Sequence, residues 1–290
     1  MSDREPPRYP YVAIDVAEDD VDEAGALLFE LGAAGVEQRD ATTLVRGAPG
    51  KVTLVASFER AEEARAATAE LPGAWAPRVE EVVGDAWRDE WKKHFEPFLV
   101  CAGVVVRPPW RDYAAAAGEH VVVLEPGRAF GTGLHETTSL VAEELAQTPL
   151  DGVTLLDVGC GSGVLSLIAL ALGATRARAV DVDPDAVAVT RENADRNGVA
   201  DRVETDETPV EALPGRYPVV VANIESKTLV DLAAALIARV APGGLLVLSG
   251  ILSAAVMPAQ LADIRRAFAA LEEEGVRTKG EWIAVLMRRS

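Results

Sequence analysis

The chain of 290 residues has little cysteine, few basic residues and no long apolar run. Its two cysteines, Cys101 and Cys160, are too few for a disulfide framework, and neither has the neighbours of a metal ligand, so no metal site is expected. No apolar run approaches the ~20 residues of a membrane-spanning helix, and the start lacks the apolar core of a signal peptide. We therefore expect a cytoplasmic protein with no membrane contact.

Basic residues are outnumbered, because 28 lysines and arginines stand against 46 aspartates and glutamates, and the formal net charge is −18. Sequence-independent binding to nucleic acid depends on lysine and arginine at the phosphates, so direct nucleic-acid binding is not expected. The charge favours a basic partner, although acidity can also serve only to keep a protein soluble. With 49% hydrophobic residues, the chain can form one large domain and one small one.

Residues 154–184 are typical of one β-α-β unit. An apolar strand-like run (154–158) enters a glycine-rich turn, an apolar helix-like segment follows to residue 172, and a second strand (178–182) ends in acidic residues. The turn between the first strand and the helix indicates which class of ligand this unit binds.

That turn has Gly159, Gly161 and Gly163, so the backbone can approach a ligand closely and open a helix whose free amides face it. The dinucleotide fingerprint requires its third glycine one position later, where this chain has Val164. Asp181 follows Gly159 by 22 residues, where a carboxylate can accept both ribose hydroxyls. A plain tight turn explains the glycines alone, but the whole pattern favours an adenosine ligand without a pyrophosphate.

The first 84 residues predict a ferredoxin-like module with the order β-α-β-β-α-β. It either presents a surface to a partner or only stabilises the rest of the chain. The expected strands are 9–17, 35–46, 51–58 and 78–83, and the expected helices are 21–32 and 59–71.

Residues 85–98 predict an amphipathic linker helix, with Trp87, Trp91 and Phe95 four residues apart on one face. Such a stripe usually packs in a core, and His94 beside it is assigned a structural role too. Residues 99–290 would then form the second domain. Its outer parts are expected to include a strand at 99–107, helices at 228–240 and 254–273, and a final strand at 281–287.

Two further segments of this domain border the expected ligand crevice. Residues 125–140 combine a glycine loop with His135–Thr138 at the start of a helix, which could hold a carboxylate; an ordinary capped helix entry is the alternative. The apolar run 217–222 predicts a buried parallel strand that ends at Asn223. Because strand carboxyl ends face the crevice in open α/β sheets, Asn223 is the best candidate for the reaction centre.

Several motifs together resemble the ribosomal protein L11 methyltransferase family of class I S-adenosylmethionine-dependent methyltransferases. The resemblance spans nearly the whole chain and rests on AFGTG-x-H-x-TT, LDVGCGSG, AVDVDP, VVVANI, LSGIL and GEW, together with EWKKHFEPF at 90–98. It implies an α/β fold: a Rossmann-like domain with a mostly parallel seven-stranded sheet, behind a small ferredoxin-like α+β domain that recognises the substrate.

The resemblance also implies an activity, a cofactor and a set of site residues. A monomeric enzyme would move methyl groups from S-adenosylmethionine to lysine side-chain and N-terminal amines of ribosomal protein L11. Asn223 is the candidate catalytic residue, with its amide oxygen orienting the neutral amine. The implied cofactor contacts are Phe130, Gly131, Thr132, Thr138, Gly159, Gly161, Asp181 and Asn223.

Three positions depart from the family pattern on the substrate side: Leu134, Glu136 and Glu225. Methylation of another basic protein or of a small amine therefore stays open, as does a non-catalytic module that only binds S-adenosylmethionine. A nicotinamide-dependent oxidoreductase on the same fold is a weaker alternative, because it would need glycine in place of Val164.

Overall fold

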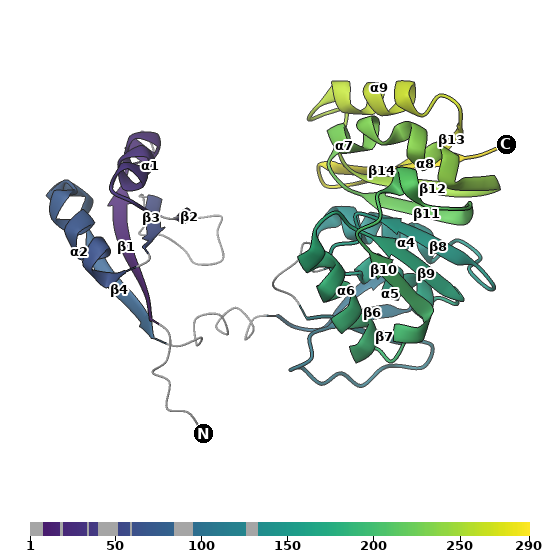
Figure 1. Cartoon of the computed structure of the whole chain (residues 1–290), viewed down its shortest axis with the longest axis horizontal. Coiled ribbons are helices and arrows are strands. Elements are labelled where there is room, and N and C mark those ends of the chain that lie inside the picture. The colour runs from purple at the N-terminus through teal and green to yellow at the C-terminus, as the bar shows by residue number, and fades with distance from the viewer. Residues whose placement is uncertain are drawn as a thin grey trace. The chain divides into compact units, whose positions relative to one another are not determined.

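The computed structural model describes residues 8–17, 20–33, 35–39, 52–58, 60–83, 95–125 and 133–290. The chain divides into two compact units, Met1–His94 and Phe95–Ser290, which we call the N-terminal and C-terminal units (Figure 1). None of the helices in the described ranges is long and apolar enough to cross a membrane.

The N-terminal unit has the ferredoxin-like plan that the sequence predicts. Its antiparallel sheet has the order β2-β3-β1-β4, and both helices cover one face of it. Ile14, Leu28 and Leu54 are fully buried between sheet and helices. The elements are β1 (Arg8–Val16), α1 (Val21–Glu30), β2 (Gly35–Arg39), β3 (Val52–Ser57), α2 (Ala61–Glu70), a 3₁₀ turn (Gly73–Trp75) and β4 (Arg78–Val83).

A seven-stranded sheet with the order β10-β9-β8-β11-β12-β14-β13 forms the centre of the C-terminal unit. Every pairing from β10 to β12 is parallel, and β14 runs antiparallel to both of its neighbours. The chain order reverses between β8 and β11, where ligands of such sheets bind. The strands are β8 (Thr154–Val158), β9 (Arg176–Val180), β10 (Val203–Asp206), β11 (Tyr217–Asn223), β12 (Val240–Leu252), β13 (Glu272–Lys279) and β14 (Trp282–Arg288).

Helices cover both faces of this sheet, so successive strand residues are apolar on either side. Leu155 packs into the core beneath α4 and α5, whereas its neighbour Leu156 packs into the core beneath α7, α8 and α9. The helices are α4 (Glu136–Leu145), α5 (Val164–Ala171), α6 (Pro184–Arg196), α7 (Ser226–Asp231), α8 (Ala233–Arg239) and α9 (Pro258–Ala267), with 3₁₀ turns at Ala200–Arg202 and Val210–Ala212.

A second sheet of three short strands packs its apolar residues into the core beneath α4 and α5. It consists of β5 (Phe98–Cys101), β6 (Val104–Arg107) and β7 (His120–Val123). The single strand predicted at 99–107 is therefore wrong, because Gly103, with φ of +77°, turns the chain between two antiparallel strands. The linker helix predicted at 85–98 is wrong at its end, because residues 95–97 have no regular secondary structure and Phe98 begins β5. Residues 85–94 of that prediction lie outside the described residues.

Two helix predictions in the second half of the sheet are also wrong. The helix predicted at 254–273 spans only Pro258–Ala267, which is α9, and the last two residues of the predicted range begin the edge strand β13, because pairing with β14 outweighs the helix preference of its glutamates. The segment predicted at 228–240 forms α7 and α8, and Val240 already belongs to β12.

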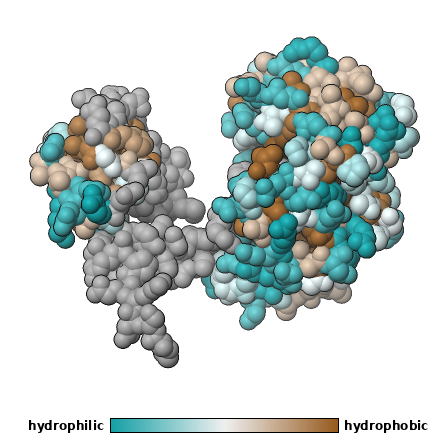
Figure 2. All heavy atoms as spheres, viewed as in Figure 1, coloured by the Kyte–Doolittle hydropathy of each residue, from teal (hydrophilic) through white to brown (hydrophobic). Residues whose placement is uncertain are grey.

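On the face shown in Figure 2, the surface of the C-terminal unit is mostly hydrophilic, with hydrophobic residues in small separate groups. Scattered apolar residues are normal on a protein surface. An apolar side chain that is mostly exposed beside a cavity is more informative, because it can form a contact surface for a ligand.

Candidate active site

The glycine turn between β8 and α5 forms because only glycine adopts its backbone angles without strain. Gly159, Gly161 and Gly163 have φ values of +72°, +53° and +78°, all in the left-handed region. The amide of Gly159 donates to the carbonyl oxygen of Val180 at 2.8 Å, which fixes the turn to the end of β9. A Cβ on Gly159 would overlap the side chain of Ile224, so the turn also lies against the segment that follows β11.

The carboxylate of Asp181 lies directly after β9 and faces this turn. Its Oδ2 accepts a hydrogen bond from the amide of Gly161 at 2.9 Å, and its Oδ1 accepts one from the amide of Asp183 at 3.1 Å. Two backbone donors thus hold the carboxylate in one orientation while leaving it lone pairs for a ligand. The next residue, Val182, is 82% exposed, so an apolar surface lies beside the carboxylate.

Asn223 and Thr138 meet across the crevice although 85 residues separate them. Asn223 ends β11, Thr138 lies in the first turn of α4, and the amide nitrogen of Asn223 donates to Oγ1 of Thr138 at 3.4 Å. His135, the N-cap of α4, accepts from the amide of Thr137. The ring of His135 contacts that of Trp282 edge to face, with centroids 5.0 Å apart.

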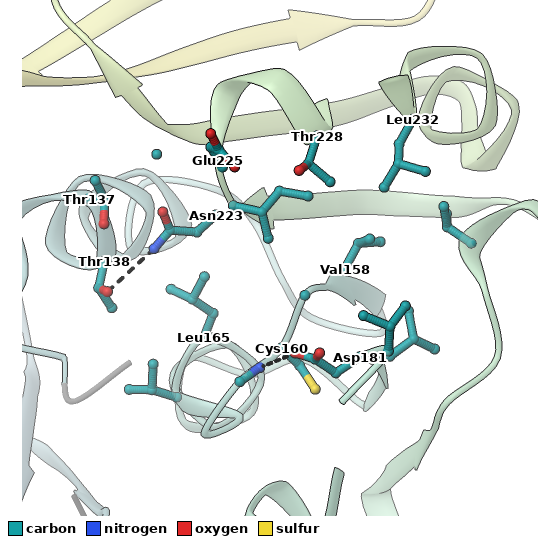
Figure 3. Close-up of a pocket in the computed structure, with 18 of the residues that line it drawn as sticks. Thr137, Thr138, Val158, Cys160, Leu165, Asp181, Asn223, Glu225, Thr228 and Leu232 are labelled. Carbon is teal, nitrogen blue, oxygen red and sulfur yellow. Dashed lines mark hydrogen bonds between the residues drawn. The ribbon is translucent and has the colours of Figure 1, made fainter. Parts of the chain in front are cut away.

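These groups line one cavity of about 750 Å³ at the carboxyl ends of β8, β9 and β11. Figure 3 shows Thr138 and Asn223 on one side of it and Asp181 near the glycine turn on the other. Three carboxylates line the cavity, those of Asp181, Glu211 and Glu225. Among the described residues, no lysine or arginine lines it.

Of the residues predicted to bind the cofactor, five line this cavity: Thr138, Gly159, Gly161, Asp181 and Asn223. The amide of Gly161 already donates to Asp181 and its carbonyl accepts from Thr190, so Gly161 shapes the turn rather than offering a free polar group. Phe130, Gly131 and Thr132 lie outside the described residues.

The sequence reasoning missed several lining residues. The predicted catalytic and cofactor residues end at Asn223 in the chain, yet Gly250 and Trp282 from the second half of the sheet also line the cavity. Trp282 could have been found, since it lies in the GEW motif used for the family resemblance. Val182 could have been recognised as an apolar residue between two aspartates at a strand end.

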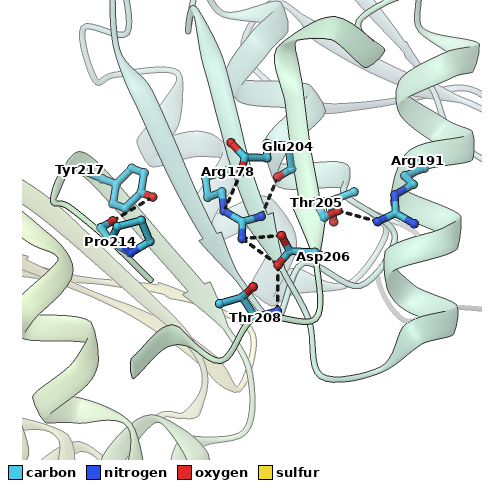
Figure 4. Close-up of polar contacts among 8 residues, drawn as sticks. All are labelled: Arg178, Arg191, Glu204, Thr205, Asp206, Thr208, Pro214 and Tyr217. Carbon is cyan, nitrogen blue, oxygen red and sulfur yellow. Dashed lines mark hydrogen bonds and ion pairs between the residues drawn. The ribbon is translucent and has the colours of Figure 1, made fainter. Parts of the chain in front are cut away.

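An ion pair positions one wall of the cavity. Arg178 on β9, whose side chain is 8% exposed, donates from Nη2 to both carboxylate oxygens of Asp206 on β10, at 2.7 and 2.8 Å (Figure 4). Oδ1 of Asp206 also accepts from the amide of Thr208 at 2.8 Å, and Thr208 begins the lining segment that ends at Glu211. The guanidinium of Arg178 lowers the pKa of Asp206 to about 2.

Asp157 holds the start of helix α5 from inside the sheet. Its Oδ2 accepts hydrogen bonds from the amide of Ser166 at 3.2 Å and from its hydroxyl at 2.8 Å. Burial raises the pKa of Asp157 to about 6, although these two bonds oppose the shift. A buried acid at a helix N-terminus is a structural cap rather than a solvent-facing base.

Cys160 lies inside the glycine turn, where its Sγ is 3.4 Å from Oγ1 of Thr190. Burial raises the pKa of its thiol to about 12, so the group is neutral at physiological pH and is not an activated nucleophile.

The donor set of the cavity fits S-adenosylmethionine. Asp181 can accept both ribose hydroxyls, exposed Val182 offers a surface for the adenine ring, and no described basic side chain would repel the sulfonium. The cavity has the size usual for small-molecule sites. The strand order, the glycine turn and the acidic strand end define a class I S-adenosylmethionine-dependent methyltransferase.

Comparison with known proteins identifies the family. The family model described as ribosomal protein L11 methyltransferase matches residues 8–290, and the chain belongs to this family. A ribosomal protein L11 methyltransferase of Sorangium cellulosum is 58% identical over 253 residues, which is 85% of this chain and 80% of that protein. One of Pelobacter propionicus is 43% identical over 76% of this chain and 72% of its own length.

A solved structure agrees with this assignment. The crystal structure of a ribosomal protein L11 methylase from Lactobacillus delbrueckii subsp. bulgaricus superposes with a TM-score of 0.62 at 28% identity. The match covers 68% of this chain and all of that one.

Proposed function

We propose that this methyltransferase transfers methyl groups to the lysine side-chain and N-terminal amines of ribosomal protein L11. The observation that carries the proposal is the cavity that brings Asp181, a nucleoside-binding carboxylate, together with Asn223 at a strand end. Membership of the ribosomal protein L11 methyltransferase family supports the acceptor. The net charge of −18 suits a basic substrate.

In this proposal, one group of residues binds the nucleoside end of the cofactor and another lies at its methionine end. Asp181 binds the ribose hydroxyls, Gly159 allows close approach at the glycine turn, and Thr138 lies at the methionine end together with Asn223. Phe130, Gly131 and Thr132 are also assigned to the methionine end of the cofactor.

When bound, S-adenosylmethionine supplies a methyl group on a positively charged sulfur. Transfer to an amine would form an N–C bond in exchange for the methyl–sulfur bond, whose electron pair would stay on sulfur. Asn223 orients the neutral amine through its amide oxygen, because its amide nitrogen is directed at Thr138. Holding the reacting atoms in line supplies about 7 kcal/mol or more of the barrier reduction. The amine first loses a proton to water, since its reference pKa is about 10.4.

The N-terminal unit recognises the ribosomal protein in this proposal, with residues 1–84 as the recognition domain, 85–98 as the linker and 99–290 as the catalytic domain. The enzyme acts as a monomer in the cytoplasm, without direct binding to nucleic acid or membrane. The low content of basic residues supports the absence of direct nucleic-acid binding.

A methyl-transfer assay tests the proposal: full-length protein, methyl-labelled S-adenosylmethionine and recombinant ribosomal protein L11. We expect label on L11, and a loss with Asp181→Ala because cofactor affinity falls about tenfold to a hundredfold without the hydrogen bonds of a charged acceptor. Asp185→Ala is the matched control, as Asp185 is an exposed acid of the next helix that does not line the cavity.

The outcomes separate the parts of the proposal. Cofactor binding with no label on L11 would refute the acceptor and direct the search to other basic proteins or small amines. Binding without turnover on any amine would favour a non-catalytic module. Equal cofactor affinity in wild type and Asp181→Ala would refute the assigned cofactor site.

A further inference from the structure

The three carboxylates of the cavity lie in different parts of it. Asp181 is held by backbone amides beside the glycine turn, and Glu211 ends the wall that begins at Thr208. Glu225 lies two residues after Asn223, at the end of the cavity where the reaction centre is proposed (Figure 3). A charge at this end faces an acceptor rather than the nucleoside.

The side chain of Glu225 has no structural partner to explain it. Glu225 is the N-cap of α7, but its carboxylate makes no capping hydrogen bond. Glu225 is exposed, and within the described part of the chain its carboxylate forms no hydrogen bond or ion pair. A carboxylate at a cavity rim without an ion pair is available to a cationic ligand.

Helical spacing turns Glu225 toward the cavity. Glu225, Thr228 and Leu232 are three and four residues apart, so they share one face, and all three line the cavity (Figure 3). This face presents a carboxylate, a hydroxyl and an apolar group in succession. Asp231, on the same helix, does not line the cavity.

We propose that Glu225 is a specificity residue that binds the acceptor amine in its protonated form at the entrance to the reaction centre. The inference rests on the proposed function and deepens it, because it assigns a recognition residue for cationic amines. A lysine ammonium reaching Asn223 would pass this carboxylate in a cavity that no described lysine or arginine lines.

Electrostatics restricts Glu225 to the binding step. A carboxylate beside an ammonium stabilises the charged form and raises the pKa of the amine, which opposes the proton loss that methylation requires. Glu225 therefore favours encounter and binding, and the amine becomes neutral only after it moves on to Asn223. The predicted consequence is an effect on the KM for the acceptor with little effect on kcat.

The test measures steady-state methylation of full-length ribosomal protein L11 by full-length wild type, Glu225→Gln and Asp231→Asn. Glu225→Gln should raise the acceptor KM about two- to fivefold, the range of an exposed charge pair, with kcat and the affinity for S-adenosylmethionine unchanged. Glu225→Lys should raise KM about tenfold or more, because it repels the ammonium.

Asp231→Asn is the matched control, since it removes the same charge from the same helix away from the cavity. It should leave all three constants as in wild type. Salt provides a second readout, because added sodium chloride should raise the wild-type KM and leave that of Glu225→Gln nearly flat.

Three results would overturn the inference while leaving the proposed function intact: Glu225→Gln matching Asp231→Asn in KM and salt dependence, a fall in kcat at constant KM, or a weakened affinity for S-adenosylmethionine. The last result would place Glu225 at the cofactor's own ammonium. Absence of turnover in the wild type would instead refute the proposed function.

Discussion

Asn223 is the residue on which the proposed chemistry depends most. Its amide nitrogen donates to Thr138, so its oxygen is left to orient an amine. Asn223→Ala should lower kcat about a hundredfold, because a misplaced nucleophile loses the in-line geometry. Thr138→Val, which keeps the shape but removes the hydroxyl, should give an intermediate loss. Single-turnover methylation of ribosomal protein L11 measures both.

Full turnover in Asn223→Ala at unchanged cofactor affinity would show that another group orients the amine. If the loss of methylation rate in Asn223→Ala were matched by an equal loss of cofactor affinity, Asn223 would act on the cofactor alone. Titration calorimetry with S-adenosylmethionine separates these results.

The sequence could predict those residues whose backbone conformation or charge serves a single purpose at that position. Gly159 and Asp181 were found because a left-handed turn and a carboxylate 22 residues later follow from the β-α-β unit itself. Trp282 and Gly250 lie in two motifs of the family resemblance, but they were not assigned to the site, because their place depends on how distant strands align in the sheet. No periodicity in the chain records that alignment.

The loop between β11 and α7 is held in place by a close backbone approach from β12. Gly250 has φ of +83°, and a Cβ there would overlap the carbonyl oxygen of Ile224, next to Asn223. Gly250→Ala should therefore lower the unfolding free energy by more than about 3 kcal/mol and reduce methylation, since the added carbon displaces the segment that carries Asn223.

Gly243 is the matched control on the same strand, with φ of +71° but open space where a Cβ would lie. Gly243→Ala should cost only about 1–2 kcal/mol for the left-handed backbone and leave activity unchanged. Similar losses in the two variants, measured by urea unfolding, would show that Ile224 moves aside without consequence.

The ion pair Arg178–Asp206 links β9 to β10, so we expect the free energy of unfolding to fall when acid protonates Asp206. The folded pKa of Asp206, about 2, lies below its usual value of about 3.9. Its contribution is therefore present above pH 4 and is lost as pH falls toward 2. Because the Asp206 side chain is 42% exposed, we expect only about 0.5–1 kcal/mol.

Asp206→Ala tests both the stability and the site. It should remove that part of the decline between pH 4 and pH 2 in urea unfolding, and it should weaken S-adenosylmethionine binding because the amide of Thr208 loses its acceptor. Glu273→Ala breaks a similar pair with Arg265 at 2.8 Å, neither residue of which lines the cavity, and should leave cofactor affinity unchanged. Equal cofactor affinities in both variants would contradict the role of Asp206 in the wall.

Helices and strands with a clear local sequence pattern were predicted well, whereas those that form only through pairing with other strands were not. The mostly apolar runs of β8 and β11 and the capped start of α4 are visible in the chain. The edge strand β13, with its run of glutamates, was not predicted, because most of its residues are exposed and only pairing with β14 makes it a strand. Charged residues on an edge strand also prevent pairing with other chains.

At the level of the whole chain, the described parts of the machinery lie in one unit. Both cores beneath the seven-stranded sheet and every described residue that lines the cavity belong to residues 95–290. The N-terminal unit has a separate core of its own. Cofactor binding should therefore be independent of the N-terminal unit, whereas recognition of a protein substrate should require it.

Removing residues 1–94 tests this division. The 95–290 fragment should fold and bind S-adenosylmethionine within about threefold of the full chain, while kcat/KM for ribosomal protein L11 should fall about a hundredfold or more, as the docking energy is lost. Adding residues 1–94 as a separate chain should not restore the rate, because covalent linkage supplies the effective concentration. Full methylation by the fragment would show that the C-terminal unit selects its own substrate, and loss of cofactor binding would show that the site needs both units.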